Sequence, residues 1–122
     1  FRSTVTITSA AAATPVNILA DASVPTGKKA YVTGVLGKVN GATVWATTAT
    51  VVIEDTAAVA GVTYAVAGMT ANALLGLTTA NVTVGAPIST GVGFTAAKGL
   101  QIVGNANGTG SDFIVTVTGY IA

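Results

Sequence analysis

The 122-residue sequence contains neither cysteine nor histidine. Without cysteine, the chain can form no disulfide and offers no thiolate for catalysis or metal binding. Without histidine, it lacks the commonest metal ligand and the side chain best suited to proton transfer near neutral pH. Both absences weigh against an enzyme, and we expect no catalytic residue, no cofactor and no metal.

Charged side chains are also scarce: they make up 7% of the chain, against roughly 25% in an ordinary soluble domain. Five basic and four acidic residues leave a net charge of +1. A surface that follows a phosphate backbone needs clustered cations. The one basic pair is Lys28-Lys29, which we interpret as keeping a strand entrance solvated. A nucleic-acid partner is therefore not expected.

Residues 56–97 carry no charge and the mean hydropathy is +0.73, so a membrane span has to be considered. The stretch consists mainly of Ala, Gly, Thr, Val and Asn. It has no 20-residue block dominated by Leu, Ile or Phe and no flanking basic cluster. The N-terminus shows no apolar core of a signal peptide, and the missing initiating Met indicates a processed or trimmed chain. We predict no membrane partner.

β-Branched residues recur with period two between Gly, Pro and Asn, a pattern typical of strands. About eight to ten such runs follow one another with no room for a long helix. The pattern predicts an all-β fold, a jelly-roll-like antiparallel β-sandwich of about eight to ten short strands. We expect residues 15–122 to form this sandwich as a single domain, and residues 1–14 to form an extended, Ala-rich N-terminal arm.

A hairpin is predicted near the middle of the chain. The alternation in residues 29–39 indicates a strand with Tyr31 and Val35 on the same face. Asn40-Gly41 favours a tight turn, because both residues tolerate a positive φ. The return strand over residues 42–55 would place three apolar side chains on one face: Trp45, Val51 and Ile53.

A second hairpin is predicted at the C-terminal end, with the octapeptide NANGTGSD (residues 105–112) as its connector. The inward face would hold six apolar residues: Leu100, Ile102, Phe113, Val115, Val117 and Ile121. The octapeptide is rich in side-chain oxygen, so a calcium loop is the alternative. Calcium takes six to eight oxygen ligands, usually with several carboxylates, and Asp112 is the only carboxylate here. We interpret the segment as a plain turn.

Two further patterns have both a chemical and a structural interpretation. Glu54 and Asp55 are the only adjacent acids, but neighbouring residues on a strand point to opposite faces, so they are a poor acid–base couple. Trp45 and Tyr64 could form a sugar-stacking platform, although a single tryptophan is more often a core residue.

Three stretches carry a resemblance to a known family. They are PTGKKAYVT at Pro25–Thr33, VVIEDT at Val51–Thr56 and GSDFIVTVTGY at Gly110–Tyr120. With these stretches the chain from Val24 onward resembles the small β-sandwich decoration (cement) proteins of tailed bacteriophage capsids. The resemblance implies a structural, jelly-roll-like virion protein, often a homotrimer, on the outer capsid surface, where it binds and stabilises the major capsid protein. The alternative is a carbohydrate- or receptor-binding β-sandwich module of a phage tail or bacterial surface structure.

The scarcity of charge also fits a protein that covers part of its surface in an assembly. The uncharged residues 56–97 and the N-terminal arm are the candidate contacts. The predicted interface residues are Phe1, Val5, Ile7, Leu74, Leu75 and Leu77. Exposed aromatic side chains beside a groove would favour the binding module, whereas a flat apolar base with a lateral self-interface would favour the capsid protein.

Overall fold

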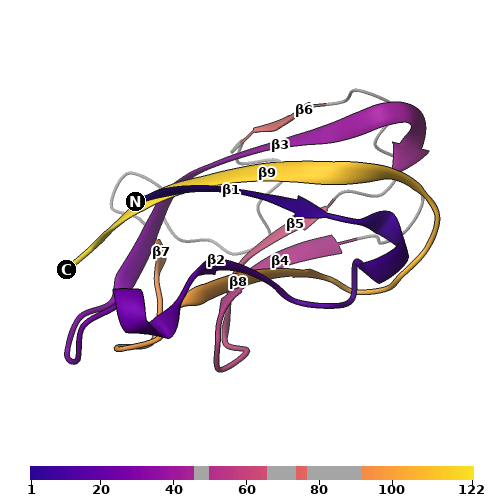
Figure 1. Ribbon diagram of the computed structural model, residues 1–122. Coiled ribbons are helices and arrows are strands. Elements are labelled where there is room, and N and C mark those ends of the chain that lie inside the picture. Colours follow the sequence, from indigo (N-terminus) through magenta and orange to yellow (C-terminus); the bar gives the residue numbers. More distant parts are fainter. Residues whose placement is uncertain (46–49, 66–73, 77–91) are drawn as a thin grey trace.

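The computed structural model describes residues 1–45, 50–65, 74–76 and 92–122. These residues form nine strands and two short 3-10 helices (Figure 1). The strands are β1 (Arg2–Ile7), β2 (Val16–Leu19), β3 (Ala30–Trp45), β4 (Thr50–Asp55), β5 (Ala60–Ala65), β6 (Leu74–Gly76), β7 (Val92–Gly93), β8 (Leu100–Gly104) and β9 (Gly110–Ile121). The 3-10 helices are η1 (Ser9–Ala11) and η2 (Asp21–Ser23).

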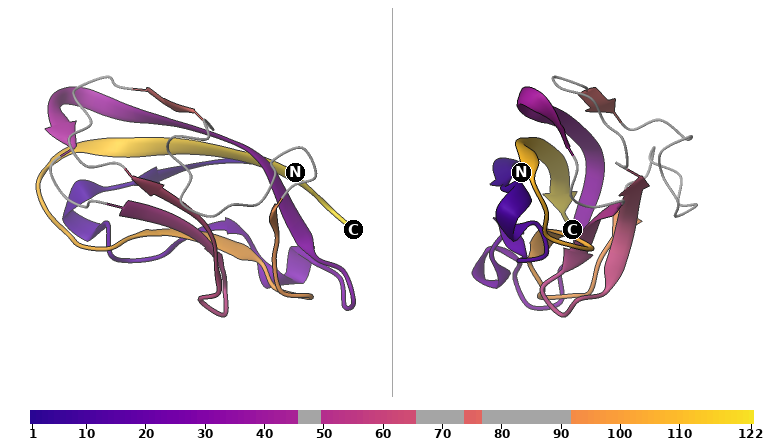
Figure 2. Two further views of the ribbon diagram at one scale, coloured as in Figure 1. Left: turned by 180° about the vertical axis from the view of Figure 1, so that it is seen from behind. Right: turned by 90° about the vertical axis from the view of Figure 1, so that its right-hand side faces the viewer.

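The strands form two antiparallel sheets that lie face to face (Figure 2). Within the described residues, the five-stranded sheet has the order β1-β9-β3-β6, with β7 also pairing with β3. The four-stranded sheet has the order β2-β8-β4-β5. Strands that follow one another in the chain belong to different sheets, with two exceptions. β4 and β5 are neighbours in the four-stranded sheet, and β6 and β7 both pair with β3 in the other sheet. This is the strand order of a jelly roll, so the predicted fold class is confirmed.

The core lies between the sheets, where alternate residues of each strand point inward. In β8 and β9 the pattern follows the sequence: Leu100, Ile102, Phe113, Val115 and Val117 are buried, as predicted. Val51 and Ile53 of β4 are buried as well. The largest fully buried side chains are Phe113, Ile7, Ile53, Leu100, Ile102, Val39, Val51, Val62 and Val115.

The predicted C-terminal hairpin is not present. β8 pairs with β2 and β4, whereas β9 pairs with β1 and β3 in the other sheet. The octapeptide therefore connects the two sheets across one end of the sandwich. The sequence pattern identified two half-buried strands correctly, but alternation does not say which strand pairs with which.

The hairpin predicted at Asn40-Gly41 is also wrong. β3 continues through these residues to Trp45 and keeps β9 as its partner, with a shift of register between Asn40 and Trp45. Gly41 has φ 153° and lies against Ser111, whose hydroxyl is 3.1 Å from the Thr43 backbone nitrogen. Gly41 therefore adopts its positive φ at an irregularity within a long strand and not in a turn.

A second irregularity in β3 changes the predicted faces. The register with β9 shifts between Val32 and Gly34, which places one extra residue, Thr33, in β3. Val32 and Val35 are both buried, three residues apart, whereas Tyr31 is only half-buried. Tyr31 and Val35 therefore do not share a face, because a bulge reverses the alternation.

The N-terminal segment is part of the sandwich rather than a separate arm. β1 pairs antiparallel with β9 along its whole length, from Arg2 opposite Thr118 to Ile7 opposite Phe113. Both chain ends lie at the same end of the molecule in Figure 1. No helix in the described residues is long and apolar enough to span a membrane.

Candidate functional site

Asp55, the last residue of β4, has a fully buried carboxylate. Its Oδ1 accepts hydrogen bonds from the backbone N–H groups of Ala57 at 2.9 Å and Val59 at 3.0 Å. Its Oδ2 accepts one from the Thr95 N–H at 3.3 Å. One carboxylate therefore fixes the β4–β5 turn and attaches it to the loop that follows β7.

The hydrogen bonds to Asp55 also determine its ionisation. Burial by itself raises the pKa of the Asp55 carboxyl, because it disfavours the charged form. The hydroxyl and N–H of Thr95 and the N–H groups of Val59 and Ala57 outweigh that effect, so the pKa lies below its ordinary value. Asp55 is therefore a charged acceptor whose donors are supplied by the fold.

Asp21, at the start of η2, does a similar task in a more exposed position. Its Oδ1 accepts hydrogen bonds from the Thr56 hydroxyl and, at 2.6 Å, from the Gly99 N–H. Lys98 Nζ lies 3.8 Å from Oδ2. The Thr56 hydroxyl, the Gly99 N–H and the Lys98 charge together hold the pKa of Asp21 below its ordinary value. Asp21 thus joins η2 to both loops that Asp55 connects.

We call residues 20–24, 55–60 and 94–99 the clamped loops. They contain two alanines in the left-handed region, Ala58 with φ 62° and Ala97 with φ 58°. Such a conformation costs about 1–2 kcal/mol for an L-residue, so it persists only where the surroundings impose it. At Ala58 the Asp55 carboxylate holds the N–H groups on either side, and at Ala97 the N–H donates to the Lys28 carbonyl oxygen. The β4–β5 turn presents an apolar tip, Ala57–Ala60, in which Val59 is 54% exposed.

The octapeptide uses its oxygen atoms to bind backbone. Its acceptor–donor pairs are Asn105 Oδ1 with Thr50 N at 3.2 Å, Asn107 Oδ1 with Ala13 N at 2.7 Å, and Asp112 Oδ1 with Ser9 N at 3.3 Å. The side-chain oxygens that suggested a calcium loop thus tie the connector to η1, to Ala13 and to β4. The described part of the chain contains no group of three or more His, Cys, Asp or Glu side chains that could hold a metal.

The outer face of the five-stranded sheet is the second surface of interest. Hydroxyl groups follow it across the strands, and the Thr4 and Thr116 Oγ1 atoms lie 2.8 Å apart. Tyr31 and Tyr120 stack on it with ring centroids 4.9 Å apart and an interplanar angle of 6°. Leu36, 56% exposed, and Tyr120, 43% exposed, are two of the three large apolar side chains exposed in the described residues.

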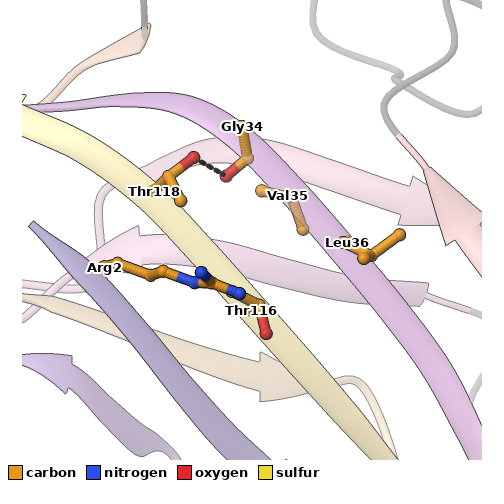
Figure 3. A pocket seen from close by; sticks show the side chains of 6 residues that line it. All are labelled: Arg2, Gly34, Val35, Leu36, Thr116 and Thr118. Carbon is orange, nitrogen blue, oxygen red and sulfur yellow. Dashed lines mark hydrogen bonds between the residues drawn. The ribbon is translucent and has the colours of Figure 1, made fainter.

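A hollow of about 300 Å³ lies on this outer face, and we call it the sheet hollow (Figure 3). Its lining residues are Arg2, Gly34, Val35, Leu36, Thr116 and Thr118. The Thr118 hydroxyl donates a hydrogen bond to the Gly34 carbonyl oxygen at 3.3 Å. In Figure 3 the Arg2 side chain extends from β1 across β9 towards Thr116. Of the two stacked tyrosines only Tyr120 is exposed, and neither ring lines the hollow.

The predicted interface residues lie in different parts of the fold. Ile7 is fully buried, and Phe1 and Val5 pack against the core, so these three side chains contribute to the protein's own interior. Leu74 and Leu75 belong to β6, which borders β3 at Lys38 and Gly37. Leu77 lies outside the described residues.

The other sequence patterns are separated by the structure. Glu54 accepts a hydrogen bond from the Gln101 amide at 2.7 Å on the outer face of its sheet, whereas Asp55 is buried. The two acids thus point to opposite faces, as predicted. Trp45 belongs to the five-stranded sheet and Tyr64 to the four-stranded sheet. The clamp by Asp55 was missed, although an aspartate before a turn commonly accepts from the N–H two residues on.

Acids and bases have different tasks in the described residues. Each of the four carboxylates accepts at least one hydrogen bond within the protein. Of the five basic side chains, only Lys98 forms an ion pair there. Arg2, Lys28, Lys29 and Lys38 therefore have no ion-pair partner among the described residues.

Comparisons with protein-family models, with curated proteins and with solved structures find no match to this chain.

Proposed function

We propose that this protein is a non-enzymatic decoration protein that binds the outer surface of an assembled phage capsid and stabilises it. The observation that carries the proposal is the jelly-roll strand order, combined with a charge-poor surface. Jelly rolls are a common architecture of viral coat proteins and of lectins. A surface with few charges loses little when it is covered by another protein, because few ions have to be desolvated.

The three stretches that resemble the decoration proteins fall on the framework of the fold. Pro25–Thr33 leads into β3, Val51–Thr56 covers the end of β4 with its clamping aspartate, and Gly110–Tyr120 is nearly all of β9. β3, β4 and β9 are inner strands of their sheets. The resemblance is therefore a resemblance of scaffold, which suits a protein whose task is structural.

The apolar tip Ala57–Ala60 is the surface that we assign to the capsid. Val59 offers an exposed apolar anchor, and the polar groups of Asp21, Thr56 and Lys98 lie at its base. An apolar centre with a polar rim is the usual anatomy of a protein interface. Because the clamp holds the tip in place before binding, little conformational entropy is lost on docking.

We further propose that the protein acts as a homotrimer, with β6 and the uncharged residues 56–97 near the subunit contacts. This part rests on the resemblance and on the scarcity of charge. Sedimentation equilibrium at micromolar concentration measures it directly, and three times the chain mass of 11.8 kDa is the expected result. A single species of monomer mass would contradict it.

The capsid proposal is tested on gradient-purified virions from the producing culture. Quantitative mass spectrometry should find the protein at a fixed ratio to the major capsid protein, set by the capsid symmetry. Val59→Glu should abolish rebinding to particles stripped of the protein, because it places a charge at the centre of the contact. Thr6→Glu is the matched control, since it adds the same charge at an exposed position of β1, in the other sheet and outside residues 56–97.

Particles that lack the protein would overturn the capsid proposal. Equal rebinding by Val59→Glu and the native protein would overturn the assignment of the tip. In the first case a receptor-binding module of a tail or cell surface becomes the better-supported function.

A further inference from the structure

The sheet hollow exists because of the bulge in β3. The extra residue at Thr33 places Gly34 opposite Thr118, and glycine has no side chain to fill the space. A Cβ built on Gly34 would lie 2.5 Å from the Thr118 hydroxyl oxygen. Tyr31 and Leu36 project outward on either side of this position, so the outer face is open between them.

The lining of the hollow offers side-chain groups rather than backbone groups. β9 is paired on both sides, with β1 and with β3, so its N–H and C=O groups are largely engaged in the sheet. A peptide that adds a strand needs an open sheet edge, and the hollow has none over β9. A ligand here meets the hydroxyls of Thr116 and Thr118 and the Leu36 side chain.

Arg2 gives the hollow a charge. Its guanidinium forms no ion pair or hydrogen bond with the described residues, and it lies on the exposed side of β1. Asp112 lies towards the other end of β9 from Thr118, the residue that pairs with Arg2, and it accepts a hydrogen bond from the Ser9 N–H. A guanidinium presents a planar fork that matches a carboxylate through two parallel hydrogen bonds. The charge complement of this site is therefore an anion, and a carboxylate fits it.

The stacked tyrosines extend the hollow along β9. Tyr120 follows Thr118 by two residues on the same outward face, so its ring stands one side-chain position from the lining. Tyrosine offers an apolar ring and a polar tip, and Leu36 offers a second apolar wall. The volume is at the lower end of the range of about 300–1,000 Å³ for ligand pockets, which suits a small ligand.

We propose that the sheet hollow binds an acidic saccharide, with the carboxylate of one sugar unit on Arg2. Sugar hydroxyls exchange hydrogen bonds with Thr116 and Thr118, and the C–H face of a sugar ring packs against Leu36 or Tyr120. A saccharide combines the three properties that the lining requires: many hydroxyls, an apolar ring face and a negative charge. The site is separate from the tip Ala57–Ala60 and does not depend on the capsid proposal.

The test is isothermal titration calorimetry of the full chain with trigalacturonate at low ionic strength. The comparison ligands are its methyl ester, which removes the charge, and triglutamate, which keeps the charge without the sugar. We expect millimolar or tighter binding of trigalacturonate. The ester should bind at least about tenfold more weakly, because a charged hydrogen-bond pair is lost. Triglutamate should also bind at least about tenfold more weakly, because it lacks the ring and its hydroxyls.

Two matched variants separate the hollow from general charge attraction. Arg2→Gln should weaken binding of trigalacturonate at least about tenfold. Lys38→Gln removes the same charge from the same face but lies outside the lining, so it should change binding less than about twofold. Circular dichroism confirms that both variants retain the strand spectrum.

Three results would overturn the proposal. They are the absence of binding at 10 mM trigalacturonate, equal weakening by Arg2→Gln and Lys38→Gln, and binding of triglutamate as tight as that of trigalacturonate. The second would mean a diffuse attraction of anions. The third would mean that the site recognises charge alone, as for an acidic peptide.

Discussion

In the clamped loops, the carboxylates of Asp21 and Asp55 accept hydrogen bonds from residues 55–60 and 94–99, and they hold these two segments and η2 together. On the outer face of the five-stranded sheet, Arg2 and Lys38 have no ion-pair partner in the described part of the chain. The two regions therefore use charge in opposite ways. The comparison teaches that a chain with nine charged residues can use its acids as hydrogen-bond acceptors within the fold while its bases other than Lys98 form no ion pair among the described residues.

Removing the Asp55 carboxylate should break the first region and gives the largest expected effect. Asp55→Ala leaves the backbone N–H groups of Ala57, Val59 and Thr95 without this acceptor and removes a buried carboxylate. We expect a loss of about 3 kcal/mol in the free energy of unfolding and a fall of roughly 10 °C in Tm, measured by urea and thermal denaturation.

Glu54→Ala is the control for that measurement. It removes a neighbouring carboxylate that accepts a hydrogen bond from Gln101 on the outer face, so its cost should stay below about 1 kcal/mol. Equal destabilisation by the two variants would mean that the buried clamp has no special role.

Two glycines of β3 compare the inside of the five-stranded sheet with its outside. A Cβ on buried Gly37 would meet the ring of Phe113, a fully buried side chain that cannot move away, so Gly37→Ala should cost roughly 1–3 kcal/mol. A Cβ on Gly34 would meet only the Thr118 hydroxyl, which can rotate, so Gly34→Ala should cost under about 1 kcal/mol.

Gly34→Ala should still weaken trigalacturonate binding, because it fills the hollow, whereas Gly37→Ala should leave the affinity of the folded protein unchanged. Urea denaturation and calorimetry of both variants provide the two readouts. A larger stability loss for Gly34→Ala than for Gly37→Ala would contradict the assignment of inner and outer faces.

Acid should lower the free energy of unfolding through the clamped loops, by less than the substitutions above. The pKa values of Asp21 and Asp55 are lowered in the fold, so the unfolded chain binds more protons around their ordinary value of about 3.9. Their contribution to stability is complete above that value and is lost as the pH falls through the lowered pKa values.

The urea midpoint measured from neutral pH down to about pH 2 checks this prediction, since the loss must begin near the ordinary carboxyl pKa of about 3.9. Asp21→Asn should flatten part of the decline, because the substituted group no longer titrates. A decline that is identical in the native protein and in Asp21→Asn would exclude Asp21 as a source of the pH dependence.

The sequence was sufficient to predict the strands that have one buried and one solvent-facing side. β4, β8 and β9 each bury alternate residues, and the period-two pattern of a half-buried strand records that directly. The fold class followed from the same pattern. Pairing did not, because the partners of β8 and β9 lie far away in the chain and alternation is the same whichever partner a strand has.

The site was less accessible from the sequence. The hollow depends on a one-residue bulge at Thr33, which neither the composition nor the residue spacing predicts. It also depends on Arg2, whose side chain crosses β9 from a segment that we expected to be an arm. Asp55 was recognised as an acid at a strand end, but its burial comes from the loop around Thr95, 40 residues further on. Tertiary contacts of this kind decide what a polar side chain does.

The central claim is that the acids hold the fold while the bases of the outer face bind. A ¹⁵N–¹H NMR titration of the native chain with trigalacturonate tests it in one experiment. We predict shifts of the amide signals of Arg2, Gly34, Leu36, Thr116 and Thr118, with those of Ala57, Val59 and Thr95 unchanged. Shifts of similar size around Lys28, Lys29 and Lys98 as around Arg2, or movement of the clamped amides, would contradict the claim.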